Sequence, residues 1–266
     1  MYTTIKTLAA LFALALGAPA YATAIAIVNA GFEDPYLGSN LPPIYAGDVP
    51  PTAFPVGPAP GGWSAFGAAG NGASIGVLNP GVAGVDPGAS FFPGGAPEGD
   101  NVALLYANGA GSGAEFGIAQ TLVATLQAHT RYTLEVDVGN IASGTSAEPL
   151  LFAGFGFFNL DGFPGYRIDV LAGSTLVAQD TNGVSPGEGE FLTSMLQWTT
   201  GAAPVGFGEA LSIRLVNLRN ADDPAATGLE VDFDNVRLDA APVPLPPGLA
   251  LLGLPLVLGL RRRRAG

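Results

Sequence analysis

Carboxylates are the side chains best placed to do chemistry in this sequence, which has 22 Asp and Glu residues, one histidine and no cysteine. Acid–base catalysis, glycoside hydrolysis by paired carboxylates and binding of hard cations are therefore possible. A thiol nucleophile, a cysteine-ligated metal and a disulfide framework are excluded. The single histidine, His129, precedes a predicted strand and is expected to be a surface residue.

The closing segment 231–238 (VDFDNVRL) places carboxylates inside a predicted strand. Strict alternation would put Asp232 and Asp234 on the apolar face, where an unpaired carboxylate is very costly. A β-bulge at Asp234–Asn235, pairing with an arginine such as Arg237, or a bound Ca²⁺ would each avoid that cost. The bulge would turn four apolar side chains inward: Val231, Phe233, Val236 and Leu238.

Aromatic side chains beside polar groups are candidates for stacking on a sugar ring. Tyr106 ends a predicted strand and stands two residues before Asn108, at the entry to a glycine-rich loop, so this pair is predicted to bind a ligand. Trp63 could serve either the core or a ligand, whereas Trp198 alternates within its strand and is expected in the core.

Short alternating strands must position these residues. Residues 131–138 and 210–216 alternate cleanly between apolar and polar side chains, and glycine, proline, asparagine or aspartate separates most of the candidates. Further strands are expected over 24–28, 73–78, 102–107, 117–123, 150–158, 166–172, 175–179, 193–199 and 229–238, with a short helical turn near 122–128. This pattern predicts an all-β, antiparallel β-sandwich of jelly-roll type over 25–240, with a loop-rich insertion over 35–100.

The charge distribution restricts the class of molecule that the protein can bind. All 22 acidic residues lie between Glu33 and Asp239 together with five arginines, so this stretch has a formal charge of −17. Nucleic-acid binding requires a basic surface and is excluded, whereas cation binding is favoured.

The two ends of the chain are expected to be targeting segments. Residues 1–24 combine Lys6, an apolar stretch and small residues, which is typical of a secretory signal peptide. Residues 241–266 contain an apolar stretch over 243–260 followed by four arginines, which predicts a membrane-spanning helix with a cytoplasmic basic end. The apolar stretch begins with Val243, Pro244, Leu245 and Pro246, and the arginines are Arg261, Arg262, Arg263 and Arg264.

This C-terminal arrangement resembles the PEP-CTERM class of sorting tails in its VPLPA-type variant. Leu245 stands where the common form of the motif has Glu, and Pro247 stands where the variant usually has Ala. The resemblance implies an exosortase-type membrane enzyme as partner, transient anchoring in the cytoplasmic membrane, and a final location at the cell surface or in an exopolysaccharide matrix.

Two motifs that bracket the domain resemble carbohydrate-binding modules of the galactose-binding-like jelly-roll class. The opening motif is NAGFE, which ends at Glu33, and the closing motif is the segment 231–238. In such families a structural Ca²⁺ commonly ties the first strand region to the last. The resemblance therefore implies Glu33 and Asp234 as metal ligands, with Asp232 as a further candidate.

Together these features predict an exported, non-catalytic surface or matrix protein that associates with extracellular polysaccharide. One alternative is a secreted glycan-active enzyme that uses paired carboxylates, which would be distinguished by two carboxylates converging in an aromatic-lined cleft. The other alternative is a purely structural surface protein without a ligand.

Overall fold

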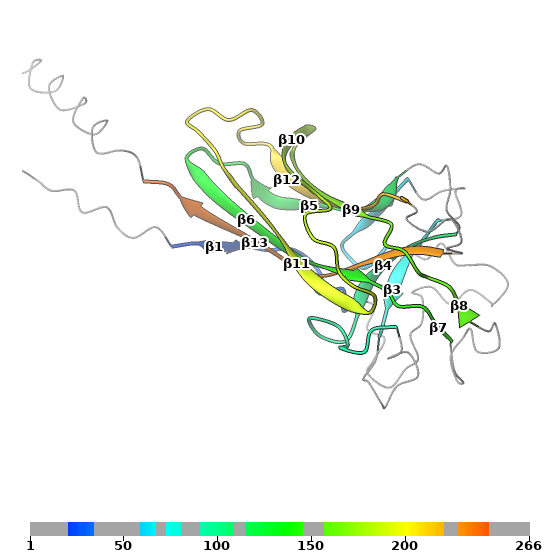
Figure 1. Ribbon diagram of the computed structural model, residues 1–266. Helices are drawn as coiled ribbons and strands as arrows, with labels where there is room; N and C mark the ends of the chain where they lie inside the picture. Colours follow the sequence, from blue (N-terminus) through cyan, green and yellow to red (C-terminus); the bar gives the residue numbers. More distant parts are fainter. Residues whose placement is uncertain are drawn as a thin grey trace, which may run out of the picture.

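The computed structural model describes residues 21–34, 59–67, 73–80, 91–108, 115–145, 157–220 and 228–244. Within these ranges the chain forms two antiparallel sheets packed face to face (Figure 1), which confirms the predicted all-β sandwich. None of the described residues is helical, and no helix long and apolar enough to cross a membrane occurs among them. The expected helical turn near 122–128 is wrong, because the strand there continues to Thr125.

The first sheet contains the long strands of the domain. Its order is β11-β6-β13-β4-β3, with β1 pairing along β13. The strands are β1 (Thr23–Ile25), β3 (Ala73–Leu78), β4 (Val102–Asn108), β6 (Thr130–Asn140), β11 (Glu190–Thr199) and β13 (Gly228–Pro242). Because β1 pairs with the last part of β13, the two ends of the described domain lie side by side (Figure 1).

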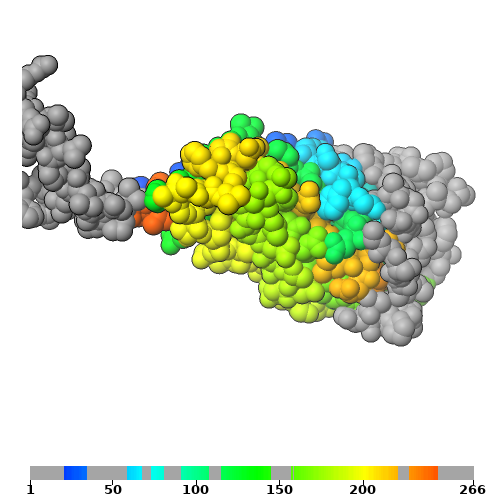
Figure 2. Space-filling model, turned by 90° about the horizontal axis from the view of Figure 1, so that it is seen from above, coloured from blue at the N-terminus to red at the C-terminus, as the bar shows by residue number. Residues whose placement is uncertain are grey.

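The second sheet has the order β10-β9-β12-β5-β2. Its strands are β2 (Ser64–Phe66), β5 (Phe116–Thr125), β9 (Tyr166–Ala172), β10 (Thr175–Thr181) and β12 (Ala210–Asn217). A separate short pair joins β7 (Gly144–Thr145) to β8 (Phe157–Phe158). Figure 2 shows a face of the molecule on which residues of β9, β10 and β11, coloured yellow-green to yellow, form much of the visible surface.

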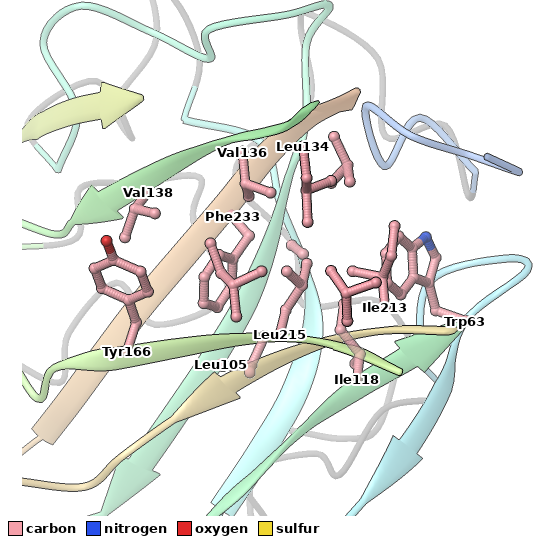
Figure 3. Close-up of a cluster of buried hydrophobic side chains, with 14 of the residues drawn as sticks. Trp63, Leu105, Ile118, Leu134, Val136, Val138, Tyr166, Ile213, Leu215 and Phe233 are labelled. Carbon is pink, nitrogen blue, oxygen red and sulfur yellow. The ribbon is translucent and has the colours of Figure 1, made fainter. Parts of the chain in front are cut away.

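The core lies between the two sheets, where alternate residues of each strand point inward. Val136, Val138 and Phe233 of the first sheet face Tyr166 and Leu215 of the second (Figure 3). Trp63 belongs to this cluster, with its ring 5.4 Å from that of Phe32. The apolar pattern seen in the sequence is therefore sufficient to hold the sandwich together.

A β-bulge interrupts β13, which is one of the three arrangements that the burial argument left open. The register against β6 shifts between Asp234 and Arg237, and Asn235 takes a positive φ of 54°. The bulge turns all four apolar residues into the core: Val231, Phe233, Val236 and Leu238. Arg237 instead points outward and pairs with Glu135 at 2.9 Å.

The part of the outer face of the first sheet that β4 and the start of β13 form is also covered, which the strand pattern does not predict. Residues of the segment 91–101, together with Ile141 and Leu160, pack on this face as a second apolar cluster. We call the segment 91–101 the cover segment. Its side chains Phe91 and Phe92 are buried against Leu104 and Tyr106 of β4. The outward side chains in the first part of β13, which are Glu230, Asp232 and Asp234, are consequently buried.

Candidate active site

A pair of carboxyl groups lies beneath this second apolar layer. Glu230 and Asp232 are two residues apart on β13, so both side chains point to the outer face of the first sheet. Glu230 lies directly opposite Tyr106 and Asp232 directly opposite Leu104 of β4. Their exposed fractions are only 1% and 0%. This alternation makes the two carboxyl groups neighbours.

Burial changes the protonation of the pair. Desolvation raises the pKa of Glu230 to about 8, and it raises the pKa of Asp232 well above its ordinary value with a further contribution from the charge of Glu230. The two carboxyl groups are hydrogen-bonded to each other when one of them carries a proton. No other described group donates a hydrogen bond to either carboxyl. The pair therefore retains a proton near neutral pH and can act as an acid.

Tyr106 completes the cluster from the neighbouring strand. Burial, and then the charge of Glu230, raise the pKa of its phenol to about 12, so the hydroxyl stays neutral at physiological pH. Its ring needs a glycine beside it: a Cβ added at Gly228 would lie 2.5 Å from Cε2 of Tyr106 and 2.8 Å from a methyl carbon of Leu160. The close approach of Gly228 thus allows Tyr106 to lie over β13.

Apolar side chains enclose these three polar groups. Leu104, Phe92 and Leu160 belong to the same buried cluster as Tyr106, and the ring of Phe92 lies 4.5 Å from that of Phe191. Low polarity strengthens electrostatic interactions and favours the neutral acid. The arrangement can donate a proton to a weakly basic, apolar molecule, and the resulting carboxylate can stabilise a developing positive charge.

Asp234, the next outward residue of β13, has a different environment. Its carboxylate accepts hydrogen bonds from the backbone N–H groups of Glu98 (2.8 Å) and Asn235 (2.6 Å). Burial, with smaller contributions from the charges of Glu98 and Asp137, raises its pKa to about 8. Asp234 therefore attaches the cover segment to β13.

Glu33 fastens the same cover segment from the N-terminal side. One of its carboxylate oxygens accepts hydrogen bonds from the backbone N–H groups of Asp100 (2.8 Å) and Asn101 (2.9 Å), and the other accepts from the side-chain amide of Asn101 at 2.8 Å. The opening and closing motifs thus bind one segment between them.

The three residues expected to bind a metal are not gathered at one point. Asp232 pairs with Glu230, whereas Glu33 and Asp234 bind the cover segment. Within the described ranges, no group of three or more His, Cys, Asp or Glu side chains is arranged to hold a metal ion.

The predicted ligand-binding residues are divided. Tyr106 belongs to the buried acid cluster. Trp63 lies in the core and donates its indole N–H to the carbonyl of Asn29 at 3.2 Å, so it is not available for stacking on a sugar. The backbone of Asn108 pairs with Gly228, but its side chain lies outside the described part of the chain.

Sequence reasoning missed Glu230. It shares the outward alternation of Asp232 and Asp234, but alternation gives no sign that this face of the strand is buried. The sequence allows many carboxylate pairs, and whether an outward pair on one strand is buried depends on what covers that face of the sheet.

Comparisons with known proteins identify relatives of this chain. The sequence model of the HpiC1-like family, described as HpiC1 cyclase, matches residues 23–239. A crystal structure of a Stig cyclase from Fischerella sp. TAU in complex with (3Z)-3-(1-methyl-2-pyrrolidinylidene)-3H-indole is 34% identical, covers 84% of this chain and 100% of that chain, and has a TM-score of 0.64. A cyclase from the same source in complex with 4-(1H-indol-3-yl)butan-2-one has the same identity and coverage and a TM-score of 0.63. A search of curated proteins found no match.

These matches correct the functional predictions. The assignment to PEP-CTERM proteins with a carbohydrate-binding passenger is wrong, because the matched family is a cyclase family and no comparison supports a sorting tail. The non-catalytic role, the exosortase-type partner and the association with polysaccharide are wrong for the same reason: the relatives are enzymes with small-molecule ligands. Of the proposed sorting motif and helix, only Val243 and Pro244 fall within the described residues.

Proposed function

Because the chain belongs to the HpiC1-like cyclase family, we propose that it catalyses the acid-promoted cyclisation of a small apolar molecule. The observation that carries this proposal is the buried Glu230–Asp232 pair, which holds a proton near neutral pH beside Tyr106. A neutral carboxylic acid in a dry site is a competent proton donor to a carbon–carbon double bond or a weakly basic nitrogen.

We propose an indole with an unsaturated side chain as the substrate class. Two crystal structures of cyclases from Fischerella sp. TAU, each 34% identical to this chain, hold indole-containing molecules. Phe92, Leu104 and Leu160 supply the apolar and aromatic surroundings that a planar ring of this kind requires. The two acids supply the few polar groups that would orient it.

The reaction can be written as an isomerisation. Glu230 transfers its proton to one alkene carbon, which forms a C–H bond and leaves a cation on the adjacent carbon. Carbon C2 of the indole attacks this cation and forms the new ring bond. The proton on C2 then returns to the carboxylate pair, which restores the acid and the aromatic indole. No oxidant or reductant is consumed, and the negative pair stabilises the cation while it exists.

Tyr106 has an orienting role in this scheme. Its phenol stays neutral at physiological pH and lies opposite Glu230, so it can orient the substrate against the acid. It does not need to transfer a proton itself. Removing the hydroxyl should therefore weaken catalysis less than removing the acid.

The test uses the purified chain with an indole prenylated at C3, which can close a five-membered ring by the steps above. We expect a product of unchanged mass in H₂O and one additional deuterium in D₂O. Glu230→Gln should lose at least about 100-fold in turnover, and Tyr106→Phe about tenfold. Retention of full turnover by Glu230→Gln would refute the assigned acid.

Binding of 4-(1H-indol-3-yl)butan-2-one, measured by calorimetry, separates substrate choice from catalysis. Binding of this ketone without turnover of the prenylated indole would mean that the chain binds an indole ring but that the prenylated indole is not its substrate. Failure to bind this ketone and to convert the prenylated indole would overturn the indole substrate class.

We propose calcium as a structural ion near the fastened cover segment. Supporting this proposal are the carboxylate oxygens of Glu98 and Asp234, which both approach Gly31 and suit a hard cation, and the charge of Glu98, which adds to burial in raising the pKa of Asp234. Melting should rise with Ca²⁺ and fall with EDTA, since an ion that binds only the folded state stabilises it by mass action. An unchanged melting midpoint with Ca²⁺ and with EDTA would exclude the ion. The same measurement compares Asp234→Asn with Asp239→Asn, which serves as its matched control.

Export through residues 1–24 stays a prediction. Fractionation of cells that express the chain with a C-terminal tag, compared with a chain lacking these residues, measures it directly. Recovery of both in the cytoplasm would contradict the prediction.

A further inference from the structure

Asn217 is a buried polar residue that crosses the sandwich. It is the last residue of β12 in the second sheet and has an exposed fraction of 0%. Its side-chain amide donates hydrogen bonds to the backbone carbonyls of Leu105 (2.8 Å) and Leu229 (3.2 Å), which belong to β4 and β13 of the first sheet. The facing core is built mostly from apolar side chains, and a second polar contact across it joins Ser194 of β11 to Asp180 of β10.

The two carbonyls lie directly before two residues of the candidate active site. Leu105 immediately precedes Tyr106, and Leu229 immediately precedes Glu230, so each carbonyl belongs to the peptide unit that leads into a site residue. Tyr106 and Glu230 are directly paired across the strands, and their side chains point to the outer face. Asn217 therefore holds this pair of residues from the opposite, inner side of the sheet.

The orientation of the Asn217 amide is also fixed. Its oxygen accepts a hydrogen bond from the backbone N–H of Arg219 at 2.8 Å. Arg219 adopts a positive φ of 55° at this point, and its guanidinium lies 5.8 Å from the centre of the Phe116 ring. The NH₂ group is consequently the part that faces the two carbonyls, and a carboxylate or apolar side chain could not replace both donated bonds.

We propose that Asn217 is a positioning residue, which sets the spacing and orientation of Tyr106 and Glu230 by holding the two peptide units behind them. This inference rests on the proposed function of the pair. Without Asn217, two inner-face carbonyls lose their donor, and β4 and β13 can shift locally at the place where the phenol meets the acid. Small displacements of catalytic groups have large effects on rate.

The experiment compares substitutions in the full chain. Asn217→Leu removes both donated bonds with a similar volume. Asn217→Asp keeps the shape, and when protonated it restores one of the two bonds, so its effect should be intermediate. Gln120→Met is the matched control, because Gln120 also makes two buried contacts with backbone, to the N–H and the carbonyl of Val28, but these tie β5 to the N-terminal segment.

Two readouts are measured. The first is turnover of the C3-prenylated indole. The second is the infrared carbonyl band of the protonated Glu230 carboxyl, identified as the band that disappears in Glu230→Gln and followed as a function of pH. Asn217→Leu should lower turnover at least about tenfold and shift the midpoint of the band by at least about one pH unit towards acid, because a looser site admits water. Gln120→Met should leave both unchanged.

The outcomes separate the two proposals. A band that titrates in Asn217→Leu as it does in the wild type would overturn the positioning role, even if activity falls. Full activity of Glu230→Gln would instead overturn the proposed function, and the band shift would still report whether Asn217 positions the acid. If Asn217→Leu does not fold, the band in Asn217→Asp decides: an unshifted midpoint overturns the inference.

Discussion

Glu230→Gln should make the folded protein less sensitive to alkaline pH. In the folded chain, burial raises the pKa of Glu230 from its ordinary value of 4.5 to about 8. Between these two values the unfolded chain releases a proton that the folded chain retains, so the free energy of unfolding falls as pH rises through this window. Below the lower value both states are protonated, and burial of the group carries no charge penalty.

The size of this effect follows from the two pKa values. Each unit of difference corresponds to about 1.4 kcal/mol, so the change from 4.5 to about 8 gives an upper limit of roughly 5 kcal/mol. Glutamine is neutral at every pH and nearly the same size, and its NH₂ group can donate a hydrogen bond to Asp232. The substitution should therefore remove the contribution of Glu230 to the decline without opening a cavity, whereas Asp232 and Asp234, whose pKa values burial also raises, keep their contributions.

Urea unfolding at about pH 5 and about pH 8 measures the difference directly. The wild type should lose several kcal/mol of unfolding free energy between the two conditions that the variant retains. Asp239→Asn, on the same strand but far from the pair, should leave the decline unchanged. An equal decline in the wild type and in Glu230→Gln would refute the argument that the acid is buried and protonated.

Three further outcomes are expected. Turnover should fall above about pH 8, where the carboxyl pair loses its proton, and a pH–rate profile of the wild type measures this limb. Gly228→Ala should cost about 1–3 kcal/mol of unfolding free energy and reduce turnover, because the new methyl group would meet the ring of Tyr106. Gly201→Ala is the control for both assays, because a Cβ there would meet nothing within 4 Å. Glu33→Gln should loosen the cover segment and shift the infrared band of Glu230 towards acid, and an unchanged band would contradict the link between cover and acid.

The sandwich was predictable because its evidence is local. Alternation along strands such as 131–138 states which side chains share a face, and glycine and proline mark the turns between strands. The bulge at Asp234–Asn235 was predictable by a different route: the sequence offered four apolar residues whose spacing fits the core only if one residue is inserted. It could not be separated from an ion pair or a cation until the register was known.

The covering of the outer face could not be predicted in this way. Alternation predicts an inner face and an outer face, but whether the outer face meets water depends on where an irregular segment lies. The cover segment contains Phe91 and Phe92 within a stretch rich in glycine and proline, and nothing in its local pattern specifies the sheet face it will occupy. Glu230 is for that reason indistinguishable in sequence from an ordinary exposed strand residue.

The motifs that suggested a carbohydrate-binding module are informative about architecture only. Glu33 and Asp234 bind backbone N–H groups of the cover segment, which is a structural task that any ligand specificity could accompany. Of the buried acid pair, Asp232 lies within the closing motif and Glu230 lies directly before it, so the resemblance does not include Glu230. A resemblance carried by the fastening residues therefore reports how the sandwich is closed, and it led to the wrong function.

Attachment of the cover segment and the acidity of the carboxyl pair nevertheless depend on each other along β13. Three successive outward residues of this strand, Glu230, Asp232 and Asp234, are buried by the same layer. Asp234 binds that layer through backbone hydrogen bonds, and the layer in turn removes water from the other two, which raises their pKa values. The pKa values of Glu230 and Asp232 thus depend on how firmly Asp234 holds the cover segment to β13. A change that loosens the edge should alter proton donation without touching the acids, whereas a change in the core away from Asn217 should not.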